Sequence, residues 1–134
     1  MKILLTCLNF KGTTGSELYF YDLAVALKNI GHDVSILSDL EGGFLWERAQ
    51  QRKIECFHKT QAPNVDFDII IGSHEPVLKS IINDKLYRNV PIISINHSEI
   101  IPEEYPVVDI RIKHYIAIRE SIKEFLIKYI VLIL

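Results

Sequence analysis

The chain has 134 residues, of which 49% are hydrophobic and 24% are charged, and its formal net charge is −2 at pH 7. This length allows one domain with a buried core, and the composition excludes a disordered chain and a basic surface that would attract nucleic acid. Two cysteines, Cys7 and Cys56, are too few for a disulfide scaffold, so we expect reduced thiols in a cytoplasmic protein.

Short apolar runs suited to buried strands alternate along the chain with longer helical patterns. These runs cover residues 2–8, 33–38, 53–58, 68–72, 91–96 and 115–118. Several of them are apolar at consecutive positions rather than at alternate ones. This pattern indicates burial on both faces of a parallel sheet that helices cover.

The helical spacing of apolar residues predicts helices over residues 16–30, 43–52, 75–86 and 120–129. We expect Ser16 to cap the first helix and Gly31 to end it. The predicted buried faces are Leu23, Ala26, Leu27 and Ile30 in the first helix and Ile122, Phe125, Leu126 and Tyr129 in the last. The order of elements predicts an α/β fold, a Rossmann-like doubly wound parallel sheet with helices on both faces, in a single domain of residues 1–134.

The last ten residues, 125–134, are rich in apolar side chains. A bilayer span needs about 20 such residues, so this run is too short to cross a membrane. A chain that stops inside a hydrophobic run is either truncated or docks that run on another surface.

Ligands of a doubly wound sheet bind at the carboxyl ends of the strands, so the segments after each strand are the candidate sites. The first such segment holds Gly12 and Gly15 and leads into a helix, whose free N–H groups suit a phosphate or a sugar hydroxyl. A plain strand-to-helix turn is the alternative. The dinucleotide fingerprint is incomplete here, although Asp39 lies where a ribose-binding acid is expected.

Two histidines also follow predicted strands. His97 comes directly after Asn96, and its ring would project into the crevice, where it can donate or accept a hydrogen bond near neutral pH. His74 follows the fourth strand. The alternatives are an exposed loop histidine at position 97 and a helix-capping turn at position 74. The two histidines lie on separate loops with no third ligand at metal spacing, so we expect no metal site.

Several segments resemble, in order and spacing, the N-terminal domain of family-4, GT-B-type glycosyltransferases. The turn Gly12-Thr13-Thr14-Gly15-Ser16-Glu17 resembles the family's Gly-Gly-x-Glu turn, with Thr14 in place of the first glycine. Further matches are Leu23-Ala24-Val25-Ala26-Leu27, Gly31-His32-Asp33-Val34, the strand that ends at His74, Val90-Pro91-Ile92-Ile93-Ser94-Ile95-Asn96-His97, and the segment from Tyr115 to Leu126, where Arg119 replaces a capping serine. The resemblance covers nearly the whole chain.

This resemblance implies a retaining transferase that uses a nucleotide-sugar donor and a glycan or lipid-linked acceptor, without a bound metal or another cofactor. His97 is then the catalytic residue that contacts the donor sugar near the reacting carbon. The implied substrate-binding residues are Gly12, Thr13, Thr14, Gly15, Glu17, His74 and Asn96. A lipid-linked acceptor leaves open a peripheral position at the inner face of the membrane.

The family's enzymes have two domains, and this chain resembles only the first, acceptor-side domain. The donor-binding C-terminal domain is absent from the 134 residues, so we expect the isolated chain to be inactive. A partner chain that carries the donor domain, or a second copy, would cover the apolar C-terminal run. Two other functions stay open: a nucleotide-binding module of a reductase or epimerase, which relies on Asp39, Gly12 and Gly15, and a non-catalytic interaction domain.

Overall fold

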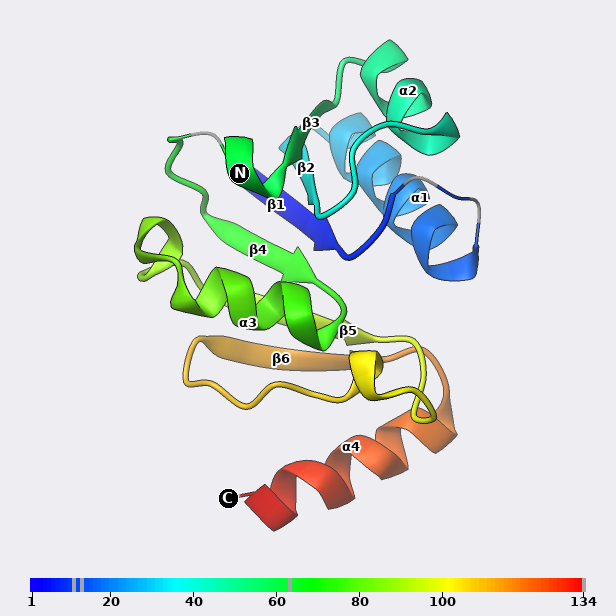
Figure 1. Ribbon diagram of the computed structural model, residues 1–134, viewed down its shortest axis with the longest axis vertical. Helices are drawn as coiled ribbons and strands as arrows, with labels where there is room; N and C mark the ends of the chain where they lie inside the picture. The colour runs from blue at the N-terminus through cyan, green and yellow to red at the C-terminus, as the bar shows by residue number, and fades with distance from the viewer. Residues whose placement is uncertain (11, 13, 63, 134) are drawn as a thin grey trace.

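The computed structural model describes residues 1–10, 12, 14–62 and 64–133. Its strands and helices alternate along most of the chain, as Figure 1 shows. In chain order they are β1 (Lys2–Cys7), α1 (Gly15–Asn29), β2 (Asp33–Ser38), α2 (Phe44–Gln51), β3 (Glu55–His58), β4 (Ile69–Gly72), α3 (Glu75–Asn83), β5 (Ile92–Asn96), β6 (Ile112–Ala117) and α4 (Glu120–Ile133). Three short 3-10 helices lie between them: η1 (Lys59–Gln61), η2 (Lys85–Tyr87) and η3 (Pro102–Glu104).

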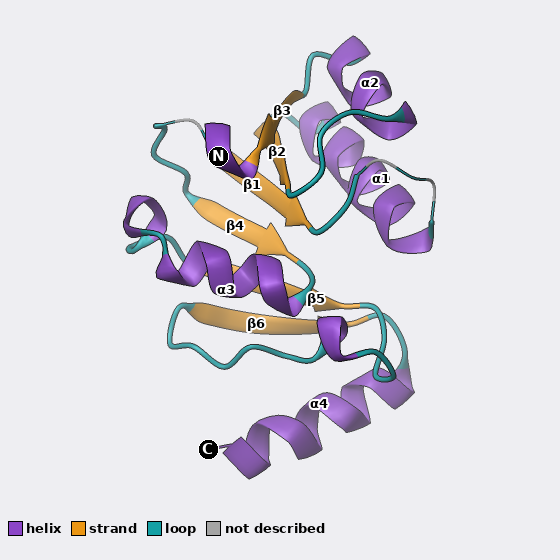
Figure 2. Ribbon diagram, in the orientation of Figure 1, coloured by secondary structure: helices purple, strands orange, loops and turns teal. Residues whose placement is uncertain are grey.

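The six strands form one sheet in the order β3-β2-β1-β4-β5-β6 (Figure 2). Every neighbouring pair is parallel, and the register starts from pairs such as Lys2 with Asp33 and Ile3 with Ile69. The winding direction reverses between β1 and β4, which is the topological switch point of the sheet. The predicted α/β, Rossmann-like fold with a parallel sheet is therefore confirmed.

Helices cover both faces of this sheet, and each face has its own apolar cluster. Side chains of β1 alternate between the clusters, with Ile3 and Leu5 directed toward α1 and α2 and Leu4 directed toward α3. All three are almost completely buried. Burial on both faces explains the consecutive apolar residues in the central strands.

Helix α1 begins earlier than predicted and buries a partly different face. Its N-cap is Thr14 rather than Ser16, and Gly31, at φ 99°, ends the helix as predicted. The predicted buried face was right only in part: Leu23 and Leu27 pack half-buried against the core, but Ala26 is exposed, Ile30 is 73% exposed, and the fully buried residues are Glu17, Phe20, Tyr21 and Ala24. The large rings at positions 20 and 21 bury more apolar area than the smaller aliphatic residues, and they turn the helix accordingly.

The connection from β5 to β6 contains only the short helix η3 and no crossover α-helix. Strand β6 begins at Ile112, three residues before the predicted strand at residues 115–118. Lys113 and His114 are exposed because β6 is the edge of the sheet, so their polarity masked this strand in the sequence.

Helix α4 packs beside β6 through Ile122 and Leu126, as its apolar spacing predicts. Three further apolar residues of this helix, Ile127, Val131 and Leu132, are exposed by 55%, 69% and 86%, and the first two line a groove beside β6. No helix among the residues that the structure describes is long and apolar enough to cross a membrane.

Candidate functional site

The candidate site lies at the carboxyl edge of the sheet, beside the switch point. Leu8 follows β1, His74 follows β4 and His97 follows β5, and these strands are neighbours in the sheet. The backbone N–H of Leu8 donates a hydrogen bond to Nδ1 of His74 over 3.2 Å. The ring of His74 therefore joins the strand ends on the two sides of the switch point.

A buried carboxylate, Glu104 of η3, brings the two histidine loops together. Its Oε1 lies 3.0 Å from Nε2 of His74. Its Oε2 accepts hydrogen bonds from the backbone N–H of His97 at 3.2 Å and from the hydroxyl of Ser73 at 3.5 Å. Glu104 is only 4% exposed, so its charge depends on these donors for stabilisation.

The contacts with the histidines keep Glu104 ionised despite its burial. Burial is the largest single influence on this carboxyl and would raise its pKa. The contacts with His74, above all its hydrogen bond, and those with His97 together outweigh burial, and the pKa of Glu104 is lowered from its usual value. The site therefore holds a buried negative charge against the ring of His74 and the backbone N–H of His97.

His74 adopts a backbone conformation that is rare for a residue with a side chain. Its φ is 73° and its ψ is 124°, and it is the N-cap of α3. Such a conformation costs on the order of 1–3 kcal/mol and persists only where the surroundings hold it. Here the contacts of the ring with Leu8 and Glu104 hold it.

The ring of His97 lies against two aromatic side chains of α1. Its centroid is 5.0 Å from that of Tyr19, with the rings nearly perpendicular, and 6.0 Å from that of Phe20. Nε2 of His97 is buried and has no hydrogen-bond partner within the part of the chain that the structure describes. A buried nitrogen of this kind is costly unless a ligand supplies a partner.

The environment of His97 favours its neutral form. Burial lowers its pKa below the usual value; Glu104 acts in the opposite direction, and His74 acts in the same direction as burial. A neutral imidazole can accept a hydrogen bond at one nitrogen and donate one at the other. His97 therefore suits contact with a hydroxyl group, which can both donate and accept.

Asn96 lies beside His97, but its amide contacts the protein. Its Nδ2 donates to the carbonyl oxygen of Glu104 at 2.8 Å, and its Oδ1 accepts from the hydroxyl of Ser94 at 3.2 Å. Asn96 is 3% exposed. In this structure its side chain fastens η3 to the end of β5, and direct contact with a substrate stays a prediction.

The glycine-containing turn packs around the buried side chain of Glu17. The Oε2 of Glu17 accepts the backbone N–H of Thr14 at 2.8 Å and would lie 2.8 Å from a Cβ placed on Gly12. Gly15, the first residue of α1, has open space where a side chain would be. The carboxylate at this helix start disfavours a second anion, so the turn suits a neutral hydroxyl better than a phosphate. Thr13, also predicted here, lies outside the described residues.

Asp39, on which the dinucleotide hypothesis relies, contacts the segment after β3. Its carboxylate pairs with Lys59 at 3.2 Å, and its carbonyl oxygen accepts a hydrogen bond from Nε2 of His58 at 2.8 Å. A ribose hydroxyl would have to compete with this ion pair.

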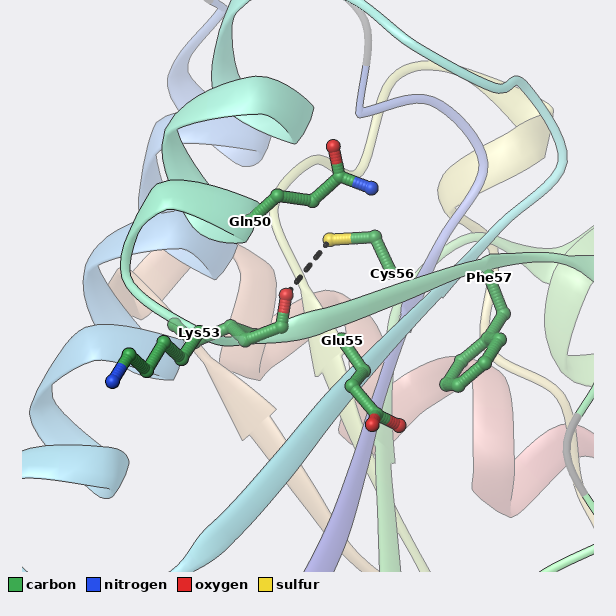
Figure 3. A pocket seen from close by; sticks show the side chains of 6 residues that line it. Gln50, Lys53, Glu55, Cys56 and Phe57 are labelled. Atoms are coloured by element: carbon green, nitrogen blue, oxygen red, sulfur yellow. Dashed lines mark hydrogen bonds between the residues drawn. The ribbon is translucent and has the colours of Figure 1, made fainter.

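A separate groove of about 420 Å³ runs along β3 at the opposite edge of the sheet from β6 (Figure 3). Within it the thiol of Cys56 is directed toward the carbonyl oxygen of Ile54 at 3.7 Å. Burial raises the pKa of Cys56 to about 12, so the thiol stays protonated at neutral pH. Cys56 is therefore not a reactive nucleophile at neutral pH.

The sequence did not identify Glu104, Tyr19 or Phe20 as site residues. The only signal was the acidic pair Glu103-Glu104 after Pro102, and the sequence does not tell which of the two is buried. Tyr19 and Phe20 lie in α1, outside the set of residues that the apolar spacing predicts to be buried. All three were missed for the same reason, because only the packing of loops and helices decides their orientation.

Comparisons with known proteins add no identification. No protein-family model matches the chain, and no curated protein matches it. Among the residues that the structure describes, no group of three or more histidine, cysteine or acidic side chains is arranged to hold a metal ion. The geometry around His97 and the sequence resemblance are therefore the two indications of function.

Proposed function

We propose that this chain is the acceptor-side domain of a retaining glycosyltransferase that uses a nucleotide-sugar donor. The observation that carries the proposal is the buried, unpartnered Nε2 of His97 at the carboxyl edge of the sheet, beside the switch point. Ligands of doubly wound folds bind at this edge. The sequence resemblance supports the same proposal, because His97 is the residue that matches the family's sugar-contacting histidine.

The chemistry of the site fits a sugar hydroxyl better than a charged group. The ring of His97 favours its neutral form and can form a hydrogen bond with a hydroxyl in either direction. Tyr19 is 36% exposed whereas Phe20 is fully buried, so a ligand would reach the ring of His97 from the side of Tyr19. A movement of the Tyr19 ring would uncover the histidine.

Transfer of the sugar requires a second protein surface that holds the donor. Orientation of donor and acceptor in a water-poor cleft provides much of the rate of such a reaction, and the 134 residues form a single sheet. We therefore propose that the donor-binding half lies outside these 134 residues, in the same chain or in a partner, and that residues 1–134 alone have no transferase activity.

A groove between β6 and α4 offers a surface against which the donor-binding half would dock. Its volume is about 610 Å³, and apolar residues of α4, among them Ile127, Ile130 and Val131, form one wall. The outer edge of β6 is unpaired, since β6 is the last strand of the sheet. Exposed aliphatic side chains beside an open strand edge are typical of a protein interface. The same groove also favours the alternative of an interaction domain without catalysis.

The proposal is tested by ligand binding to the isolated domain, followed by NMR. Titration with glucose, UDP-glucose and GDP-mannose is expected to shift the ring signals of His97 and Tyr19 for at least one of them. The matched variant His97→Ala should lose the Tyr19 shift. If none of these compounds perturbs either ring, whereas NAD shifts signals around Asp39, the reductase or epimerase hypothesis replaces the proposal. If no compound shifts any signal or raises the melting temperature, the interaction domain is favoured.

A further inference from the structure

We propose that Glu104 is a positioning residue: it fixes the ring of His74 with its hydrogen on Nε2, and it holds the backbone of His97 so that Nε2 of His97 is kept for a ligand. The identity of that ligand as a sugar rests on the proposed function. The fixed form of the His74 ring does not, because it follows from contacts within this chain.

The contacts of the His74 ring fix its tautomer. A ring nitrogen accepts a hydrogen bond only if it carries a lone pair, and Nδ1 of His74 accepts the N–H of Leu8 at 3.2 Å. Nδ1 is therefore unprotonated, and the ring hydrogen lies on Nε2. That nitrogen is 3.0 Å from Oε1 of Glu104, which accepts its hydrogen. A donor on one side and an acceptor on the other leave His74 a single arrangement.

Glu104 holds His97 through its backbone. Oε2 of Glu104 accepts the N–H of His97 at 3.2 Å. The main chain of Glu104 is held in turn, because its carbonyl oxygen accepts from Nδ2 of Asn96 at 2.8 Å. Side chain and main chain of one residue thus join the ends of β4 and β5 to η3. None of these contacts uses Nε2 of His97, which stays without a partner in the described part of the chain.

The donors around Glu104 require a carboxylate at this position. Both of its oxygens accept: Oε1 from His74, and Oε2 from the N–H of His97 and the hydroxyl of Ser73. A glutamine of the same shape would present an NH₂ group to one of these partners. Two donors would then face each other, and either His74 or His97 would lose its position. The neighbouring Glu103 is exposed, so Glu103→Gln provides a control with the same change of charge.

The test reads the histidine rings of the full 134-residue chain by two-bond ¹H–¹⁵N NMR, with the melting temperature recorded for each variant. In the wild type we expect His74 to carry its hydrogen on Nε2, with a scalar coupling across the hydrogen bond from Leu8 to Nδ1. Glu104→Gln should give a second His74 tautomer or move the ring signals of His97, depending on which partner the amide NH₂ group faces. Glu103→Gln should leave both rings unchanged.

Two results would overturn the proposal. One is a wild-type His74 with its hydrogen on Nδ1, which can be measured even if Glu104→Gln does not fold. The other is a folded Glu104→Gln variant whose His74 tautomer and His97 ring signals equal those of the wild type. If the wild type binds a sugar at His97, Glu104→Gln should weaken that binding about tenfold. If no sugar binds while the His74 ring is fixed as described, the proposed function fails and the assignment of Glu104 stands.

Discussion

The N–H of Leu8 donates to Nδ1 of His74 over 3.2 Å, although the two residues are 66 positions apart in the chain. This bond joins the end of β1 to the end of β4, where the winding of the sheet reverses. His74 meets it in a backbone conformation with φ at 73°. His74 is therefore a strained residue at the switch point whose own ring contacts hold its backbone. Substitutions of His74 measure how much these contacts stabilise the site.

Comparison of His74→Gly with His74→Ala is expected to separate the backbone strain from the contacts of the ring. Both variants lose the hydrogen bonds to Leu8 and Glu104, but only glycine adopts a φ of 73° without steric cost. We expect His74→Gly to be more stable than His74→Ala by about 1 kcal/mol in urea unfolding. Equal stabilities would show that residue 74 is not strained in solution.

Exposure of His97 is expected to raise its pKa. Burial is the main cause of the lowered pKa of this residue, and Tyr19 supplies part of the cover. Tyr19→Ala should therefore move the pKa of His97 up toward its usual value, as followed by the pH dependence of its ring signals in NMR. Glu104 and His74, the other titratable groups that act on the ring, are unchanged in this variant. A pKa that stays in place would mean that Tyr19 does not shield His97.

The stability of the domain is expected to fall as the pH decreases, in two ranges. The pKa of His97 is lowered in the folded state, so the unfolded chain binds more protons below about pH 6.5, and stability begins to fall there. The pKa of Glu104 is also lowered, so its contribution is present above about pH 4.3 and is lost as the pH falls through the folded value. Urea unfolding from pH 8 to pH 3 measures both, and His97→Phe should remove only the first decrease.

The two glycines of the first turn are expected to respond differently to an added methyl group. A Cβ on Gly12 would lie 2.8 Å from Oε2 of Glu17, whereas a Cβ on Gly15 meets nothing within 4 Å. Gly12→Ala should therefore destabilise the domain by about 1–2 kcal/mol, and Gly15→Ala should be neutral or slightly stabilising. Thermal unfolding of the two variants makes the comparison, and equal effects would contradict the packing of Glu17 against Gly12.

Substitutions on the side of α4 that lines the groove beside β6 are expected to affect binding without affecting folding. Ile127 and Val131 are exposed by 55% and 69%, so the double variant Ile127→Ser, Val131→Ser should change the unfolding free energy by less than about 1 kcal/mol. Binding of the dye anilinonaphthalene sulfonate at the groove should decrease. Ile30→Ser is a control, because Ile30 is 73% exposed on α1, away from the groove. Unchanged dye binding would mean that the groove is not an apolar binding surface.

The sequence predicted the sheet because each central strand is apolar on both faces, and this pattern does not depend on the neighbours of the strand. It placed only part of the buried face of α1, because Leu23 and Leu27 pack against the core but the larger rings of Phe20 and Tyr21 are buried in place of Ile30. It located His74 and His97, since each directly follows a predicted strand. It missed Glu104, because a loop acid becomes a site residue only through the fold that brings it to the strand ends.

The connection from β5 to β6 explains how Glu104 reaches both histidines. A crossover α-helix would place its middle residues over the face of the sheet, several residues away from any strand end. Here the chain instead bends back immediately after His97, so that η3 rests on the carboxyl edge before residues 105–111 return to the start of β6. Insertion of a helix into this connection would leave the strands paired and would still remove the acid from the ring of His74 and the backbone of His97. The shortness of η3 is therefore a requirement of the site rather than an irregularity of the sheet.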